Sequence, residues 1–214
     1  MKNEKKLIVI TALLCLLPMA IGFMLWDRLP DRVPTHFGMD GAANGWSSKP
    51  AAVFGLPLFM TAMHLLCVFA TMYDPKNKNL SRRINVLVLW LMPAVSLIVL
   101  GSVYAKAAGF DIDITKVTLV FIGLMFVVIG NYLPKCRQNY TIGIKLPWTL
   151  ADEDNWNRTH RLAGGLWIAG GLLIAAAGFA ARSLFLPLFF VAIMLMTGIP
   201  VIYSFLLYRK KSGE

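Results

Sequence analysis

The stretch that decides the fold class is INVLVLWLMPAVSLIVLGSVYA, residues 84–105, which carries no charged side chain. Arg82 and Arg83 stand directly before it, and Lys106 directly after it. As an α-helix this stretch would be about 33 Å long at about 1.5 Å per residue, which matches the roughly 30 Å hydrocarbon core of a bilayer. The stretch therefore predicts a membrane-spanning helix.

Five more uncharged apolar runs appear when the same test is applied outward along the chain. They cover residues 7–26, 51–73, 117–133, 162–181 and 184–208. The composition agrees, because 57% of the residues are hydrophobic and only 15% are charged, against roughly 25% in a soluble domain. We therefore expect an all-α integral membrane protein, a bundle of six transmembrane helices.

The first run follows Lys5 and Lys6, as the core of a cleaved signal peptide would. It continues to Trp26, which is longer than a typical signal core, so we expect an uncleaved anchor instead. Cys15 and Cys67 fall inside predicted spans and Cys136 outside them, on the cytoplasmic side of the expected topology. No structural disulfide is expected from that distribution.

Basic residues are distributed unevenly between the two sides of the predicted bundle. With the N-terminus in the cytoplasm, 15 of the 21 Lys and Arg residues face the cytoplasm, and the six on the outside are balanced by five acidic residues. The positive-inside rule therefore places both termini in the cytoplasm. This sidedness accounts for the net charge of +10, so no direct contact with nucleic acid is expected.

Two connections are long, and both are dense in Pro, Gly and aromatic residues. They divide the chain into residues 1–83, with an external loop at 27–50, and residues 84–214, with a cytoplasmic loop at 134–161. Long ordered loops on a rigid scaffold commonly carry function, so the functional residues are sought there.

The external loop offers aromatic and cationic side chains to a ligand. The dipeptide Asn44-Gly45 predicts a turn within it, so the loop is expected to be shaped rather than slack. An alternative is a lid that only caps the bundle, with its tryptophan anchored at the membrane interface. The candidate ligand-binding residues are His36, Phe37 and Trp46, which supply aromatic surface, and Arg32 and Lys49, which supply cationic donors.

The cytoplasmic loop contains a predicted helix start, because Thr149 and Asp152 resemble a capping box. A helix running without interruption over residues 150–181 would be about 48 Å long, so its first turns would project from the membrane. On such a helix Trp156 and His160 share one face with Ala163, Gly164, Trp167 and Gly171. Asp154, Arg158 and Arg161 share the opposite face, which is expected to meet water, lipid headgroups or a partner.

His64 is the single ionisable side chain near the centre of a predicted span. Such a residue suggests a functional role, although a neutral imidazole can also simply bond a neighbouring helix. The other two histidines, His36 and His160, fall in different compartments, and no span carries paired carboxylates. These features do not favour an enzyme, and no metal or cofactor is expected.

Each long loop carries a multi-residue motif. In the external loop the motif is Leu29-Pro30, Val33-Pro34, His36-Phe37, Gly41, Gly45-Trp46 and Lys49. In the inner stretch it is Asn131, Pro134, Asn139, Gly143, Pro147-Trp148-Thr149-Leu150, Trp156, Thr159-His160-Arg161 and Gly164. On these residues the chain resembles the SdpI family of bacterial immunity proteins. The second motif is similar to the family's C-terminal signature, and the first to a domain of unknown function, DUF1648, often found in the N-terminal half of these proteins. Lys145 stands where the family pattern would have arginine.

The resemblance implies an integral membrane protein that protects a bacterium against an extracellular peptide toxin. In the best-known case such a protein also tethers a cytoplasmic transcriptional repressor, so Lys145, Trp148, Arg158 and Arg161 become candidate partner-binding residues. The alternative is a small multi-pass transporter or exporter, which would give His64 a role in transport.

Overall fold

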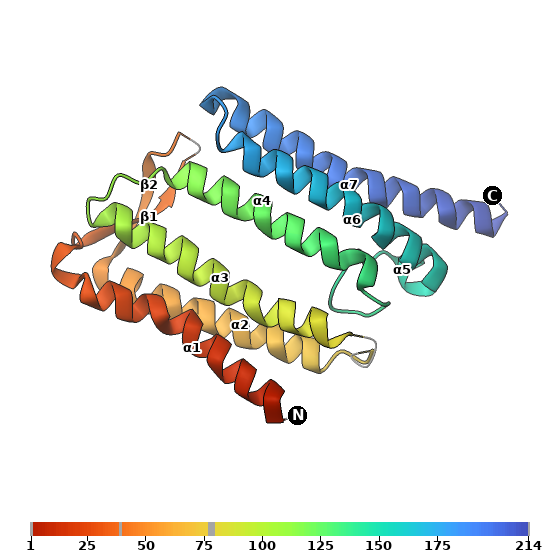
Figure 1. Ribbon diagram of the computed structural model, residues 1–214, viewed down its shortest axis with the longest axis horizontal. Helices are drawn as coiled ribbons and strands as arrows, with labels where there is room; N and C mark the ends of the chain where they lie inside the picture. The colour runs from red at the N-terminus through yellow and green to blue at the C-terminus, as the bar shows by residue number, and fades with distance from the viewer. Residues whose placement is uncertain (1, 39, 77–79, 214) are drawn as a thin grey trace. The chain divides into compact units, whose positions relative to one another are not determined.

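The computed structural model describes residues 2–38, 40–76 and 80–213, most of which lie in helices (Figure 1). Within these ranges, six helices are long and apolar enough to cross a membrane. They are Glu4–Met24, Ala51–Met72, Arg82–Ala107, Ile114–Lys135, Glu153–Ala177 and Arg182–Ser212. The prediction of a helical chain with six helices that could span a membrane is therefore confirmed, whereas insertion and orientation stay predictions.

Short elements connect and extend the long helices. The order is α1 (Lys2–Met24), η1 (Trp26–Arg28), β1 (Arg32–Phe37), β2 (Ala43–Ser48), the π-helical turn η2 (Ala51–Gly55), α2 (Leu56–Met72), α3 (Arg82–Ala107), α4 (Ile114–Tyr132), η4 (Leu133–Lys135), α5 (Pro147–Ala151), α6 (Glu153–Ala177) and α7 (Arg182–Ser212). The chain divides into two compact units. The first unit is Met1–Ala70 with Asn85–Thr118, and the second is Thr71–Ile84 with Leu119–Glu214.

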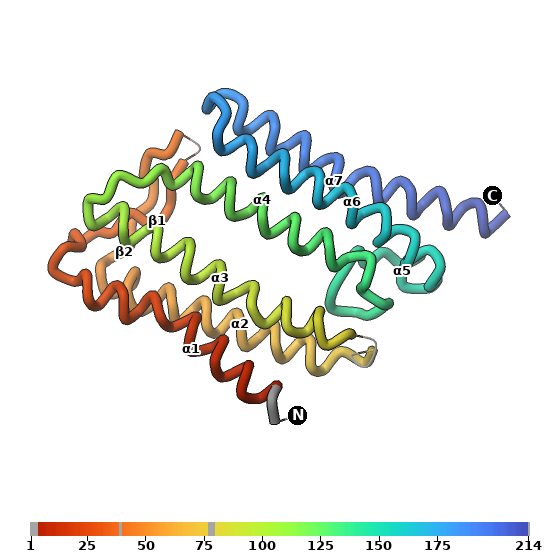
Figure 2. The backbone as a smooth tube through the Cα atoms, in the orientation of Figure 1, coloured from red at the N-terminus to blue at the C-terminus, as the bar shows by residue number. Residues whose placement is uncertain are grey.

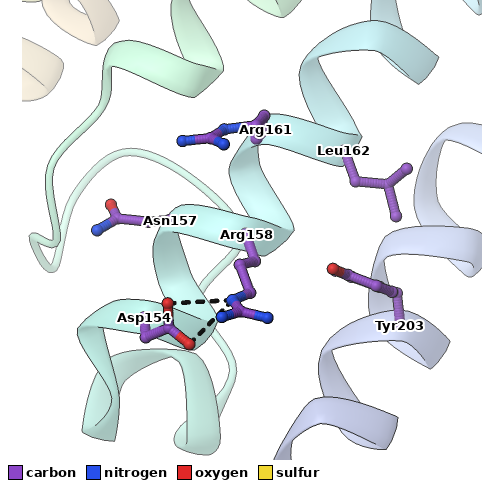
Figure 3. Close-up of a pocket in the computed structure, with 6 residues that line it drawn as sticks. All are labelled: Asp154, Asn157, Arg158, Arg161, Leu162 and Tyr203. Carbon is purple, nitrogen blue, oxygen red and sulfur yellow. Dashed lines mark hydrogen bonds and ion pairs between the residues drawn. The ribbon is translucent and has the colours of Figure 1, made fainter.

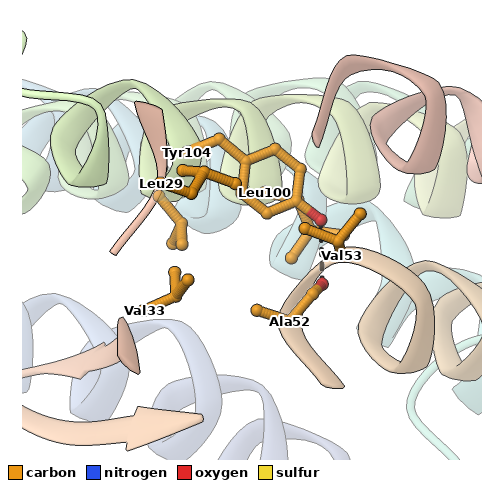
Figure 4. Packing of buried hydrophobic residues seen from close by; sticks show 7 residues of the cluster. Leu29, Val33, Ala52, Val53, Leu100 and Tyr104 are labelled. Atoms are coloured by element: carbon orange, nitrogen blue, oxygen red, sulfur yellow. Dashed lines mark hydrogen bonds between the residues drawn. The ribbon is translucent and has the colours of Figure 1, made fainter. Parts of the chain in front are cut away.

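The core of the first unit joins the external loop to the ends of the helices around it (Figure 4). Tyr104 is fully buried and donates its hydroxyl to the carbonyl oxygen of Ala52 at 2.9 Å, which satisfies the phenol and ties α3 to η2. Val33 of β1 is also fully buried in this core. The buried members of this cluster are Leu29, Val33, Ala52, Val53, Leu100, Val103 and Tyr104.

A β-hairpin forms within the external loop, which the sequence analysis did not predict. Strands β1 and β2 pair antiparallel, with Arg32 opposite Ser48 and Pro34 opposite Trp46. The prediction of a turn at Asn44-Gly45 is wrong, because both residues lie in β2. The hairpin reverses between the strands, where Gly38 donates to the carbonyl of Ala42 and Gly41 has φ +77°.

Helices α4, α6 and α7 form the core of the second unit, and α6 runs beside α7 in the ribbon and tube views (Figures 1 and 2). Helices α4 and α6 approach closely at glycines, because small residues let two helix backbones come together. A Cβ at Gly130 would lie 2.9 Å from the carbonyl oxygen of Gly164, and one at Gly164 would lie 2.8 Å from that of Gly130. Gly123 and Gly171 face one another in the same way two turns along.

The predicted uninterrupted helix over residues 150–181 is wrong. A short helix, α5, begins at Pro147, and α6 starts only after Asp152, whose backbone is extended at φ −132° and ψ 115°. The side chain of Asp152 accepts a hydrogen bond from the backbone N–H of Asp154, so it caps α6 rather than closing a capping box with Thr149. Thr149 instead accepts from the backbone N–H of Leu146 and stabilises the start of α5.

Candidate functional site

The hairpin presents one exposed face. Arg32, His36, Asn44, Trp46 and Ser48 are all exposed, and the Trp46 side chain keeps 53% of its surface accessible. Nδ1 of His36 lies 2.5 Å from Oδ1 of Asn44 across the strands, so the imidazole is oriented by its neighbour. Three of the five candidate ligand residues, Arg32, His36 and Trp46, therefore lie together on an accessible surface.

The other two candidates on this loop, Phe37 and Lys49, are engaged inside the protein. Phe37 is half-buried and packs against the core of the first unit. The Lys49 side chain is only 14% exposed, and its Nζ lies 3.4 Å from Oδ1 of Asp31 and 5.4 Å from the centre of the Trp26 ring. These contacts favour a structural role for Phe37 and Lys49 in holding the hairpin in place.

The inner loop is organised by a stacked pair, Trp156 and His160, both buried on α6. Their rings lie 4.0 Å apart, and the indole N–H of Trp156 donates to the carbonyl of Cys136 at 2.7 Å. Nδ1 of His160 lies 2.8 Å from the carbonyl of Trp156, while Nε2 accepts from the backbone N–H of Ile144 at 2.9 Å. A carbonyl can only accept, so Nδ1 carries the proton and the imidazole joins α6 to the loop.

Gly143 lies directly against this pair. Its φ of +119° is one that side-chain-bearing residues rarely adopt, and a Cβ there would overlap Nε2 of His160 and approach the Trp156 ring. The resemblance to a family signature singled out Gly143, Trp156 and His160 together. In the structure these three residues are in contact with one another.

Asp74 holds the same loop from the connection between α2 and α3, and the sequence analysis missed it. Its carboxylate accepts hydrogen bonds from the hydroxyl of Thr141, from the backbone N–H of Lys76 at 2.7 Å and from that of Tyr140 at 2.9 Å. Burial alone would raise the pKa of Asp74, but these hydrogen bonds outweigh it, so that pKa lies below the ordinary 3.8. The sequence does offer one signal for such a role, because Asp74 is an acidic residue directly after the apolar run 51–73.

Asn139 closes the loop on itself. Its fully buried side chain accepts from the backbone N–H groups of Thr141 and Ile142, at 2.9 and 2.6 Å, and donates to the carbonyls of Arg137 and Ile142, at 2.9 and 3.0 Å. Cys136 is buried beside it, and burial raises the pKa of this thiol to about 11. The loop is therefore a rigid, internally bonded segment.

The exposed face of α6 carries the candidate partner-binding arginines. As predicted, Asp154, Arg158 and Arg161 are exposed while Trp156, His160 and Gly164 are buried. Nε of Arg158 lies 2.9 Å from a carboxylate oxygen of Asp154, so the two residues form an i, i+4 ion pair (Figure 3). Arg161 has no acidic partner in the part of the chain that the structure describes.

A hollow of about 630 Å³ accompanies these arginines on the surface of α6 and α7. Leu162 of α6 and Tyr203 of α7 stand on its facing sides (Figure 3). Its lining is Asp154, Asn157, Arg158, Arg161, Leu162 and Tyr203. The mixture of cationic, polar and aromatic groups suits a polar protein surface better than a small apolar ligand.

Trp148 and Lys145 differ in how they are held. The indole N–H of Trp148 donates to the hydroxyl of Ser204 at 3.0 Å, and its ring packs against Phe205 and Tyr208 of α7. Lys145 is exposed, and its Nζ donates to the carbonyl of Thr141 at 2.9 Å. Trp148 therefore joins α5 to α7, whereas the charge of Lys145 remains accessible.

His64 is fully buried and lies 3.0 Å from the hydroxyl of Thr11, which connects α2 to α1. Its Nδ1 is buried without a hydrogen-bond partner in the described ranges. The contact with Thr11 agrees with the structural interpretation of this histidine. The described residues contain no group of three or more His, Cys, Asp or Glu side chains that could hold a metal ion.

Comparison with known proteins finds a family match that includes most or all of each long loop. Residues 135–204 match the SdpI/YfhL protein family, and residues 13–61 match a domain of unknown function, DUF1648. The resemblance to the SdpI family is confirmed. The chain is also 27% identical to Immunity protein SdpI of Bacillus subtilis (strain 168), over 98% of this chain and 99% of that protein. No solved structure matches the chain at a significant level.

Proposed function

We propose that this chain is a multi-pass protein of a bacterial cytoplasmic membrane that protects the cell against an extracellular peptide toxin. The observation that carries the proposal is the similarity to an immunity protein over 98% of the chain. The two family matches support it further, because one contains the hairpin and the other contains α5 and α6. Both termini are cytoplasmic in this proposal, as the distribution of basic residues favours.

The exposed face of the hairpin is the proposed toxin-binding surface. Trp46 supplies a large accessible ring, and His36 and Arg32 add a hydrogen-bonding group and a positive charge beside it. Aromatic and arginine side chains are the usual energetic anchors of a protein interface. Hydrogen bonding between β1 and β2 fixes the spacing of these side chains, so little ordering is needed on binding.

The exposed face of α6 is the proposed cytoplasmic partner surface, and a transcriptional repressor is its proposed occupant. Arg158 and Arg161 project from a helix whose opposite side is fixed by Trp156 and His160. Lys145 adds an accessible charge from the neighbouring loop, while Trp148 supports α5 against α7. The role is non-enzymatic, because binding on either side requires no reacting group.

Deletion of the gene in its own host tests protection directly. The deletion strain should lose viability in medium conditioned by toxin-producing neighbours, including its own parent, and expression of the wild-type chain should restore growth. Equal survival of the deletion and parent strains in every such medium would overturn the immunity role.

A small transporter is the second candidate, and the buried, unpaired Nδ1 of His64 is the observation that favours it. His64→Gln keeps a side chain able to bond Thr11 but cannot relay a proton at neutral pH. If the chain protects the cell by binding the toxin, this variant should protect normally when its membrane abundance is normal. Loss of protection at normal abundance would favour transport.

A further inference from the structure

A second charged hollow lies in the second unit and has no part in the proposed function. Its volume is about 520 Å³, and it lies where the first turn of α3 meets the end of α4 and η4. Leu80 and Tyr132 give it an apolar side. The full lining is Leu80, Ser81, Arg82, Arg83, Tyr132, Lys135 and Arg137.

Four cationic side chains line this hollow. Arg82, Arg83, Lys135 and Arg137 are all exposed, and none has an acidic partner within the described ranges. Lys135 is placed only by weak contacts, with its Nζ 3.5 Å from Oδ1 of Asn131 and 5.1 Å from the centre of the Tyr132 ring. A bound anion would neutralise charges that otherwise repel one another.

The end of α3 adds to that field. Arg82 is the first residue of α3, and the first turn of this helix contains no acidic residue. Helix N-termini favour negative charge, so two arginines there are unfavourable on their own. A bound anion would interact favourably both with the arginines and with the positive end of the helix dipole.

An apolar track leads to the hollow along α4. Leu124, Val128 and Asn131 fall within about 60° of one another on the helix at about 100° per residue. Leu124 and Val128 are 51% and 43% exposed, and Lys135 follows one turn beyond Asn131. A ligand that fits both features has an anionic head and a long apolar tail.

We propose that this hollow binds the phosphate of an anionic phospholipid, with acyl chains lying along Leu124 and Val128. The site rests on the proposed insertion in a membrane but is independent of toxin protection. Basic pockets at the ends of membrane helices and aromatic residues at the interface are where lipid headgroups bind. A soluble phosphate would use the cations but leave the apolar track uncovered.

The test is a thermal unfolding titration of the purified full chain in a neutral detergent. The three additives are dioctanoyl phosphatidylglycerol, dioctanoyl phosphatidylcholine and glycerol 3-phosphate. Phosphatidylglycerol should raise the unfolding midpoint in a saturable way, and the other two should not. Arg83→Gln with Arg137→Gln should require about 30-fold more phosphatidylglycerol for the same rise, because each cation is worth about fivefold near an anionic lipid.

Lys5→Gln with Lys6→Gln is the matched control, since it removes the same charge from exposed positions on α1. This control should respond as the wild type does. An equal loss of the phosphatidylglycerol response in both double variants would mean that only net charge matters. An equal rise of the unfolding midpoint with glycerol 3-phosphate would mean that the hollow binds soluble phosphates. Either result would overturn the proposal. If the first double variant does not fold, Arg82→Gln with Lys135→Gln takes its place with the same expected loss.

Discussion

Nε2 of His160 accepts the backbone N–H of Ile144 at 2.9 Å, and this bond joins a membrane-length helix to the loop before it. His160→Ala would leave that N–H buried without a partner and remove the stack on Trp156. We expect the variant to lose about 2 to 3 kcal/mol of stability. Chemical unfolding in detergent measures the loss. Arg161→Ala, one residue away and exposed, should change stability by less than about 0.5 kcal/mol.

Gly143→Ala should be destabilising by more than about 1 kcal/mol, because the new Cβ would meet His160 at a backbone conformation unfavourable for alanine. Gly165→Ala is the control. A Cβ at Gly165 meets nothing within 4 Å, so this helical position should gain up to about 1 kcal/mol. Similar unfolding midpoints for the two variants would contradict the contact described here.

Asp74 should make the second unit sensitive to acid. Its pKa is lowered in the folded protein, so its stabilisation is complete above the unfolded-state value near 3.8 and is lost as the pH falls through the lower folded-state pKa. Asp74→Asn replaces one accepting oxygen with a donor and should cost about 2 kcal/mol at pH 7. The difference in unfolding free energy between the wild type and Asp74→Asn should shrink below pH 4. A difference that is constant from pH 7 to pH 3 would rule out this role.

Trp46→Ala should reduce toxin protection while membrane abundance stays normal. An exposed aromatic anchor is worth about 2 kcal/mol at an interface, so about 30-fold less toxin should give the same killing. Ser48→Ala, exposed on the same strand, is the control and should protect normally. Normal protection by the Trp46 variant would contradict the proposed binding surface and favour the alternative that the hairpin only caps the helices.

Arg158→Glu with Arg161→Glu should abolish recruitment of the proposed repressor to the membrane while protection persists. Both side chains are exposed, so abundance should not change. Membrane fractionation of a tagged repressor and survival are measured in the same strain. If protection and recruitment disappear together at normal abundance, the face of α6 belongs to the protective mechanism itself.

The sequence predicts the long helices well because uncharged length is a property of each segment alone. It also predicts which side of α6 is buried, since the apolar and charged residues there follow the helical period. The hairpin was missed because its position depends on a contact distant in sequence, the burial of Val33 in the core of the first unit. The break at Asp152 was missed because the capping interaction was assigned to Thr149, whereas Asp152 itself caps α6 through the backbone N–H of Asp154.

Which of the candidate binding residues are exposed could also not be predicted from the sequence. The residue types alone could not separate Trp46, which is exposed, from Phe37, which packs inward, because the face on which each aromatic side chain lies depends on the strand register. The contacts of Lys49 with Asp31 and Trp26 could not be predicted either, and its role as a ligand donor stays a prediction.

The proposed function requires that the hairpin lie outside the cell, where it would meet the toxin, while the exposed face of α6 lies in the cytoplasm. Labelling of single cysteines with a membrane-impermeant thiol reagent in intact cells distinguishes these two sides. Ser48→Cys and Asn157→Cys are both at exposed positions, and the native Cys15, Cys67 and Cys136 are first replaced by alanine. Ser48→Cys should be labelled in intact cells, and Asn157→Cys only after permeabilisation. Labelling of Asn157→Cys in intact cells, or protection of Ser48→Cys until permeabilisation, would contradict this arrangement.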